Sequence, residues 1–89
     1  MLFEWDDAKH ERNVASRGIG FDAGALIFGG PVIEWLDERP WYGEVRVRAV
    51  GMSGGDLLHV VYTDRDEVRR IILVRKANRK EREAWQRRG

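Results

Sequence analysis

Arginine is the residue type in this chain whose abundance and spacing could carry chemistry. Of the 16 basic residues, 13 are arginines. A guanidinium group is planar, stays charged at physiological pH and can bind a phosphate through two parallel hydrogen bonds. The chemistry that we consider first is therefore phosphate binding, together with stabilisation of the negative charge that develops when a phosphodiester reacts.

The basic residues in the middle and at the end of the chain fall into three groups. The first lies in an alternating segment, the second in an apolar segment, and the third at the start of the last expected helix. The first turn of such a helix also presents free backbone N–H groups, which favour phosphate. The groups are Arg46 and Arg48; Arg69, Arg70 and Arg75; and Arg79, Lys80 and Arg82.

Alternation within the expected strands decides which of these arginines can act together. A side-chain period of two places Arg46 and Arg48 on one face of their strand. The same rule places Arg69 and Arg75 on one face of a later strand and Arg70 on the opposite face. Alternation alone therefore does not bring all the arginines into one groove. For any single arginine, a plain surface charge is at least as good an interpretation as a functional one.

Other residue types give weaker signals. The two histidines, His10 and His59, lack the spacing of a metal-binding pair, and a hydrogen-bonded strand residue is the default interpretation of His59. The glycine-rich segment 51–55 lacks the lysine and the helix of a phosphate-binding P-loop, so we interpret it as a turn. We therefore expect neither a metal site nor a cofactor.

The net charge of +1 conceals an uneven distribution along the chain. Residues 1–44 hold four basic and nine acidic side chains, whereas residues 69–89 hold nine basic and two acidic ones. A basic, arginine-rich end indicates a polyanionic partner such as nucleic acid. On charge alone, a solvated basic helix that only keeps the protein in solution is an equally good interpretation.

Length and composition limit the class of protein. A chain of 89 residues forms one domain, which we expect to span residues 1–89. It has no cysteine, which excludes disulfides and thiolate chemistry. Residues 1–7 are acidic and lack the apolar core of a signal peptide, and no apolar run approaches the ~20 residues of a membrane span. We therefore expect a cytoplasmic protein without membrane association.

The hydrophobic pattern predicts an α+β fold. Asp6 and Asp22 are expected to cap the first two helices, and Asn78 has the spacing of a capping box with Glu81. The last three strands are joined by tight turns and are expected to form an antiparallel meander. Two N-terminal helices and a basic C-terminal helix would pack on this sheet. The expected strands are 2–5, 32–36, 44–51, 57–63 and 69–75, and the expected helices are 7–16, 23–28 and the segment after residue 78.

An ordered set of residues along almost the whole chain carries a family resemblance. The set is Phe3, Glu4, Trp5, Asp6, Lys9, Asn13, Gly18, Ile19, Gly20, Phe21, Ala25, Phe28, Arg46, Gly51, Val60, Val61, Tyr62, Thr63, Arg70, Ile71, Ile72, Arg75, Ala77 and Glu81. In this order the residues resemble the BrnT toxins of type II toxin–antitoxin systems. Three positions depart from the family pattern: Arg17 replaces a histidine, Leu73 a serine and Trp85 a tyrosine.

The resemblance implies a fold related to the RelE-type ribonucleases and an endoribonuclease activity that cleaves RNA and slows translation. It also implies neutralisation by a BrnA-type antitoxin, and binding of operator DNA only through that antitoxin. A ribonuclease that works without a metal uses the ribose 2′-hydroxyl as its nucleophile. Such an enzyme needs groups that position the phosphate, stabilise the transition state and move protons.

We expect the main site residues to be arginines that match positions of the family pattern or lie next to them. The arginines expected to hold the phosphate and the transition state are Arg46, Arg70, Arg75 and Arg79. The residues expected to bind RNA are Arg48, Lys80 and Arg82. Because arginine has a pKa above ~12, it is a poor base, and another group must carry protons. The candidates are Glu81, Glu44, His59 and Lys80.

Two other functions remain open on the sequence. The chain could be a non-catalytic nucleic-acid-binding module, whose affinity would fall steeply with salt. It could also be an inactive interaction protein whose basic segment only docks an acidic partner such as the antitoxin. In that case, Trp35 and Trp41 could add apolar contact area. Toxicity on expression would separate the first function from both others.

Overall fold

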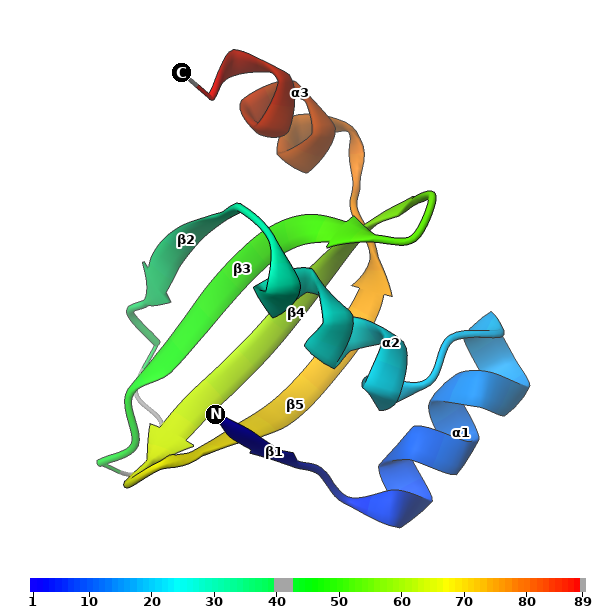
Figure 1. The fold of residues 1–89 in the computed structure, drawn as a ribbon, viewed down its shortest axis with the longest axis vertical. Coiled ribbons are helices and arrows are strands. Elements are labelled where there is room, and N and C mark those ends of the chain that lie inside the picture. Colours follow the sequence, from blue (N-terminus) through cyan, green and yellow to red (C-terminus); the bar gives the residue numbers. More distant parts are fainter. Residues whose placement is uncertain (40–42, 89) are drawn as a thin grey trace.

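A five-stranded sheet with three α-helices and one 3-10 helix forms the computed structural model, which describes residues 1–39 and 43–88. Figure 1 shows α2 lying across the sheet, α1 beside one edge and α3 beyond one end. The α+β class predicted from the sequence is confirmed. The elements are β1 (Leu2–Glu4), α1 (Asp7–Arg17), α2 (Phe21–Ala25), the 3-10 helix η1 (Leu26–Gly29), β2 (Val32–Asp37), β3 (Arg46–Ser53), β4 (Asp56–Arg65), β5 (Val68–Lys76) and α3 (Arg79–Arg87).

The strand order in the sheet is β1-β5-β4-β3-β2. The predicted meander of three strands is confirmed as β3, β4 and β5, and β2 extends it because it pairs antiparallel with β3. β1 pairs in parallel with the first residues of β5 and so forms one edge of the sheet. No helix in the described part of the chain is long and apolar enough to cross a membrane.

The hydrophobic core lies between one face of the sheet and the segment formed by α2 and η1. Phe21 and Ile27 from this segment pack against Val60, Ile71 and Val74 of β4 and β5, and all five are at most 3% exposed. Tyr62 joins the same core, and its hydroxyl donates a hydrogen bond to Glu34 at the rim. The opposite face of the sheet is therefore not covered by α2 and η1.

The cap of the first helix is confirmed, but that predicted for the second is wrong. The side chain of Asp6 accepts a hydrogen bond from the backbone N–H of Lys9, as the sequence indicates. The second helix, by contrast, begins at Phe21 with Gly20 as its N-cap, so Asp22 lies inside its first turn. The Phe21 N–H instead donates to the His10 side chain of α1 at 2.9 Å. A residue of another helix thus satisfies the first free amide of α2, and Gly20 has no side chain that could cap the helix.

A bulge in β5 overturns the predicted faces of its arginines. The strand register pairs Val61 with Leu73 but the next residue, Tyr62, with Ile71, so Ile72 is an extra residue in β5. One extra residue reverses the side-chain alternation on either side of it. As a result, Arg70 shares a face with Arg75, and Arg69 lies on the opposite, core-side face.

The close packing of Gly24 on the sheet yields a test of the core. A Cβ atom at Gly24 would lie 2.5 Å from Cγ2 of Val74, a fully buried and rotationally stiff side chain. Alanine normally stabilises a helix relative to glycine by less than ~1 kcal/mol, whereas overpacking costs ~1–3 kcal/mol. We expect Gly24→Ala to lower the free energy of unfolding by about 1–2 kcal/mol in urea titrations.

Gly29→Ala is the matched control for this variant. No described heavy atom lies within 4 Å of a Cβ built at Gly29. Its free energy of unfolding should therefore stay within ~0.5 kcal/mol of the parent. Equal unfolding midpoints for the two variants would contradict the close packing of α2 on β5.

Candidate functional site

The sheet face opposite the core carries four arginines, two of which, Arg48 and Arg75, line a hollow. We call this face, with Arg46, Arg48, Arg70 and Arg75, the arginine face. The hollow, called the sheet hollow below, has a volume of about 550 Å³. Its lining residues are Leu36, Asp37, Glu38, Arg39, Arg48, His59, Val61, Leu73 and Arg75. It lies within the size range of pockets that bind small ligands.

The strand register arranges this face in rows. Arg48 pairs with Val61, which pairs with Leu73, so a cation and two apolar side chains form one row across β3, β4 and β5. His59 and Arg75 are paired in the neighbouring row. The apolar pair Val61 and Leu73 thus lies next to Arg48 in its own row and next to His59 and Arg75 in the neighbouring row. This arrangement suits a ligand with both an apolar ring and an anionic group.

Arg75 and Glu81 form a bidentate ion pair that joins α3 to the sheet. The Nη1 and Nη2 atoms of Arg75 donate to the Glu81 carboxylate at 2.8 and 2.9 Å. The same carboxylate accepts from the backbone N–H of Asn78 at 2.8 Å, which completes the predicted capping box. Burial alone would raise the pKa of Glu81, but these hydrogen bonds hold it below its ordinary value. Glu81 is therefore a structural anion rather than a ready proton carrier.

His59 lies at the floor of the sheet hollow and is 3% exposed. Neither ring nitrogen has a hydrogen-bond partner in the described structure, and Nε2 lies 3.7 Å from Oε2 of Glu81. Burial, reinforced by the nearby charge of Arg75, lowers the pKa of His59 to about 4. The imidazole is therefore neutral at neutral pH and retains one nitrogen that can accept a proton.

Arg46 and Arg70 occupy the part of the arginine face farthest from α3, and both have acidic partners. Nε of Arg46 donates to Glu44 at 3.0 Å, and Glu44 also accepts from Arg65 at 2.7 Å. These hydrogen bonds hold the pKa of Glu44 below its ordinary value. Arg70 lies 3.5 Å from Glu4 of β1. Both arginines are therefore oriented, but largely neutralised.

Arg48 differs from these arginines because no carboxylate among the described residues pairs with it. Its guanidinium lies over the ring of Trp35, 5.4 Å from the ring centroid. The aromatic face positions the cation without cancelling its charge. Arg48, which we expected only to bind RNA, is thus a cation of the sheet hollow that no described carboxylate contacts, although Asp37 and Glu38 also line the hollow.

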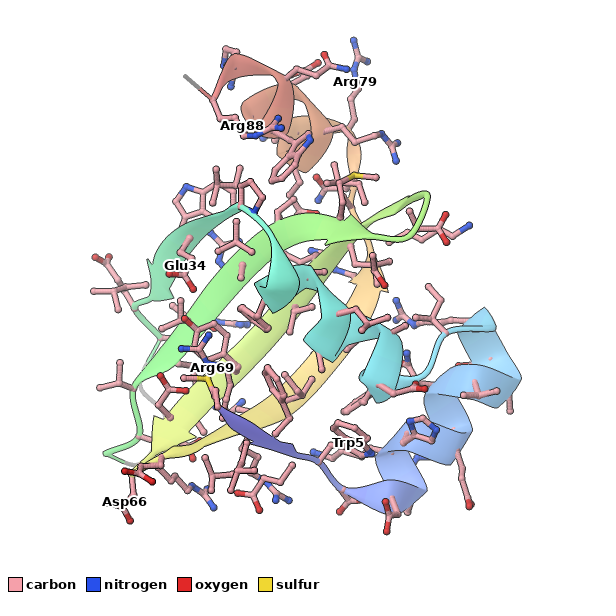
Figure 2. All side chains as sticks on the ribbon, in the orientation of Figure 1. Trp5, Glu34, Asp66, Arg69, Arg79 and Arg88 are labelled. Atoms are coloured by element: carbon pink, nitrogen blue, oxygen red, sulfur yellow. The ribbon has the colours of Figure 1, made fainter. Side chains whose placement is uncertain are left out.

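The predicted residues of α3 do not line the sheet hollow. Arg79 extends from α3 with its side chain 90% exposed and pairs with Glu83, and Figure 2 shows it beyond the end of the sheet. Arg82 donates to the backbone carbonyl of Ala77 at 2.7 Å. Lys80 is exposed on the same helix. The structure therefore brings together Arg46, Arg48, Arg70 and Arg75, and leaves these three apart.

Sequence reasoning missed the contribution of β2 to the hollow. Asp37 and Arg39 line its rim, and their side chains are joined by two hydrogen bonds. Nothing in their local sequence indicates this, because it depends on β2 pairing with β3. Trp41, considered above for partner binding, lies outside the described residues. In residues 1–39 and 43–88, no group of three or more His, Cys, Asp or Glu side chains is placed to hold a metal ion.

The neutral state of His59 predicts how stability depends on pH. An unfolded histidine has a pKa of 6.5, so the unfolded chain binds a proton in the window from 6.5 down to about 4 while the folded chain does not. Stability is therefore complete above this window and is lost as the pH falls through it. Between pH 7 and pH 5 we expect the free energy of unfolding to fall by about 2 kcal/mol.

His59→Met is the control for this pH dependence, since its side chain is apolar, adaptable and does not titrate. Urea unfolding of this variant should give nearly the same free energy at pH 7 and at pH 5. A parent protein that is equally stable at both pH values would show that His59 is not held neutral by its surroundings.

The comparison with known families agrees with this geometry. A family model for the ribonuclease toxin BrnT of type II toxin–antitoxin systems matches residues 5–81, so the match includes β2 to β5 of the sheet, α1, α2, η1 and the start of α3. No curated protein matches the chain. The matched segment contains every residue of the arginine face, and a toxin of a type II system acts with an antitoxin partner. The chain therefore belongs to the BrnT family of ribonuclease toxins of type II toxin–antitoxin systems.

Proposed function

We propose that the arginine face is the active site of a metal-independent endoribonuclease. The observation that carries this proposal is that four arginines from β3 and β5 share one sheet face, on which Arg48 and Arg75 line a hollow together with apolar side chains and a buried imidazole. Arginine forks suit phosphate, and Val61 with Leu73 offers an apolar surface for a ribose or a base. The substrate class is single-stranded RNA that enters the sheet hollow.

In the proposed reaction, the ribose 2′-hydroxyl loses its proton and its oxygen attacks the adjacent phosphorus atom, the bond to the 5′-oxygen breaks, and the products are a 2′,3′-cyclic phosphate and a 5′-hydroxyl that has taken up a proton. Arg48 and Arg75 bind the phosphate and stabilise the charge of the transition state, and Arg46 and Arg70 orient the chain next to it. His59 is the proposed proton acceptor because it is neutral and lines the hollow, and the negative charge of a bound phosphate would raise its low pKa towards neutrality. Glu81 is occupied by Arg75 and Asn78, and Glu44 by two arginines, so both are weaker candidates.

The biological role that we propose follows from membership of the family. RNA cleavage in the cytoplasm lowers translation, and a BrnA-type antitoxin binds the toxin and neutralises it. DNA binding by the complex is assigned to the antitoxin alone. Arg79, Lys80 and Arg82 lie away from the sheet hollow, and we propose that they contribute to RNA affinity rather than to the chemical step.

Arg48→Ala is the variant that best tests the site. Arg48 has no described carboxylate partner, so its removal leaves no buried charge unpaired. Loss of a group that stabilises transition-state charge costs ~10²–10³ in rate. We expect expression of the parent to arrest growth with RNA cleavage, and expression of Arg48→Ala to allow growth with intact RNA.

The exposed Arg87 of α3 provides the matched control, because Arg87→Ala removes the same charge away from the hollow. This variant should remain toxic. Circular dichroism should show both variants to be folded. Persistent growth arrest with folded Arg48→Ala would remove Arg48 from the active site, and a parent that binds RNA without cleaving it would indicate the binding-module function instead.

Metal independence has its own test with purified protein. Cleavage of a single-stranded RNA oligonucleotide should proceed at an unchanged rate in excess EDTA, because arginines and an imidazole supply the charge and the proton transfer. Loss of cleavage in EDTA that Mg²⁺ or Mn²⁺ restores would overturn the metal-independent mechanism and leave the family assignment intact.

A further inference from the structure

A second hollow adjoins the sheet hollow on the other side of Leu73. It lies between α1 and β5 and has a volume of about 540 Å³, so we call it the α1 hollow. Leu73 lines both hollows, so they meet across a single side chain. The residues used below are Lys9, Arg12, Arg17, Ile72 and Leu73, all of which line the α1 hollow.

The α1 side of this hollow is a stripe of cations on one face of a helix. Lys9 and Arg12 are three residues apart, and residues three or four apart are neighbours on a helix surface. Asn13 lies in the same stripe and donates hydrogen bonds to the carbonyls of Ile19 and Val74 at 2.9 and 3.0 Å. Because Val74 belongs to β5, this amide holds the cationic face of α1 beside the open part of the β5 edge.

The positive charge in the α1 hollow is not compensated by contact ion pairs. The side chains of Lys9, Arg12 and Arg17 are exposed, and none forms a hydrogen bond or an ion pair with the described part of the chain. This contrasts with Arg70 and Arg75, whose carboxylate partners are fixed. An anion in the α1 hollow would therefore meet three cations that no described carboxylate contacts, although Asp6 interacts with Lys9 and Arg12 at longer range.

Leu73 is an apolar ridge between the two hollows. Its side chain is 38% exposed in the middle of β5, and the bulge at Ile72 lies directly beside it. Grooves that bind single-stranded nucleic acid combine cations along the backbone path with apolar or aromatic surfaces under the bases. The sheet hollow, Leu73 and the α1 hollow present this combination in a continuous path.

We propose that the α1 hollow is a second RNA subsite, which binds the part of the strand that flanks the cleaved phosphodiester. Lys9, Arg12 and Arg17 bind the phosphates of this flanking segment while Leu73 contacts a base or a ribose. The subsite rests on the proposed function, because that function places the reacting nucleotide in the sheet hollow. RNA is favoured over an acidic protein segment because the path is continuous with the arginine face, and Leu73 lies between Arg48 and Arg75 of the sheet hollow and the cations of α1.

The test compares binding of two uncleavable RNAs that differ in length. A 2′-O-methyl dinucleotide reaches only one hollow, whereas a 2′-O-methyl octanucleotide can span both. The variant is Arg12→Ala/Arg17→Ala, and alanine retains the helical propensity of α1. The control is Arg87→Ala/Arg88→Ala, which removes the same charge at the far end of α3. Fluorescence anisotropy gives the dissociation constant of each protein–RNA combination, measured at several salt concentrations.

For the octanucleotide, we expect the Arg12→Ala/Arg17→Ala variant to raise Kd by about tenfold at low salt and to reduce the slope of log Kd against log salt by ~1.4. Its Kd for the dinucleotide should stay within about twofold of the parent, as should both values for the control. The subsite proposal would be overturned if the variant bound both RNAs equally weakly or bound both as tightly as the parent. It would also be overturned if the control lost as much affinity for the octanucleotide as the variant. Unchanged RNA binding with lost capture of the antitoxin would make the α1 hollow a protein interface and would likewise overturn it.

The outcomes also separate this proposal from the proposed function. If the parent but not the double variant shows the length dependence, and the parent does not cleave unmodified RNA, the α1 hollow remains an RNA-binding site and the ribonuclease proposal falls together with the description of this site as flanking a cleaved bond. If the parent cleaves RNA and the double variant binds both lengths like the parent, only the subsite falls. A parent that binds neither RNA would contradict both.

Discussion

The carboxylate of Glu81 connects the last helix to the sheet, and the arrangement of the site depends on it. It accepts two hydrogen bonds from Arg75 and one from the backbone of Asn78, and it stands 3.7 Å from His59. One anion thus caps α3, orients an arginine of the active face and borders the buried imidazole. Removing it would leave a partly buried cation without a partner, so the helix, the arginine and the histidine behave as one unit.

This arrangement gives the arginines of the face different roles. Glu81 uses two of the nitrogen atoms of Arg75, and a guanidinium has five N–H donors, so Arg75 can still donate to a phosphate. The net charge of the Arg75–Glu81 pair is nevertheless close to zero. In the proposed mechanism, Arg75 therefore orients the phosphate and adds little net positive charge. Arg48 is held by an aromatic ring instead of a carboxylate and keeps its charge. In the proposed site, a phosphate would therefore be attracted mainly by Arg48 and aligned by Arg75.

The features that the sequence predicts correctly are those set by neighbouring residues. The Asp6 cap and the Asn78–Glu81 capping box need only side chains within three residues of one another, and both are present. The failures are non-local. α2 begins at Phe21, whose amide donates to His10 of α1, so Asp22 lies inside the first turn instead of capping the helix. The bulge at Ile72 depends on how β5 pairs with β4, so alternation within β5 alone assigns Arg70 to the wrong face.

The charge distribution along the sequence misleads for a related reason. The basic end of the chain predicts a polyanion-binding surface there, but Arg69, Arg70 and Arg79 are paired with Asp64, Glu4 and Glu83. Charges in water are screened within ~8 Å at physiological salt, so only uncompensated cations beside a hollow act on a ligand in it. The cations without such contacts include Arg12 and Arg17 of the acidic first half.

The electrostatic potential at the two hollows therefore depends on which charged side chains pair with one another in the fold, and not on the sum of charges along the sequence. Carboxylates from β1 and α3 neutralise arginines of β5, and Asn13 brings cations of α1 to the edge of the same strand. Because α1 is held there by backbone carbonyls rather than by its charges, its cations can vary without loss of the fold. Affinity for RNA and stability of the domain are thus separable in α1, whereas Glu81 couples them in α3.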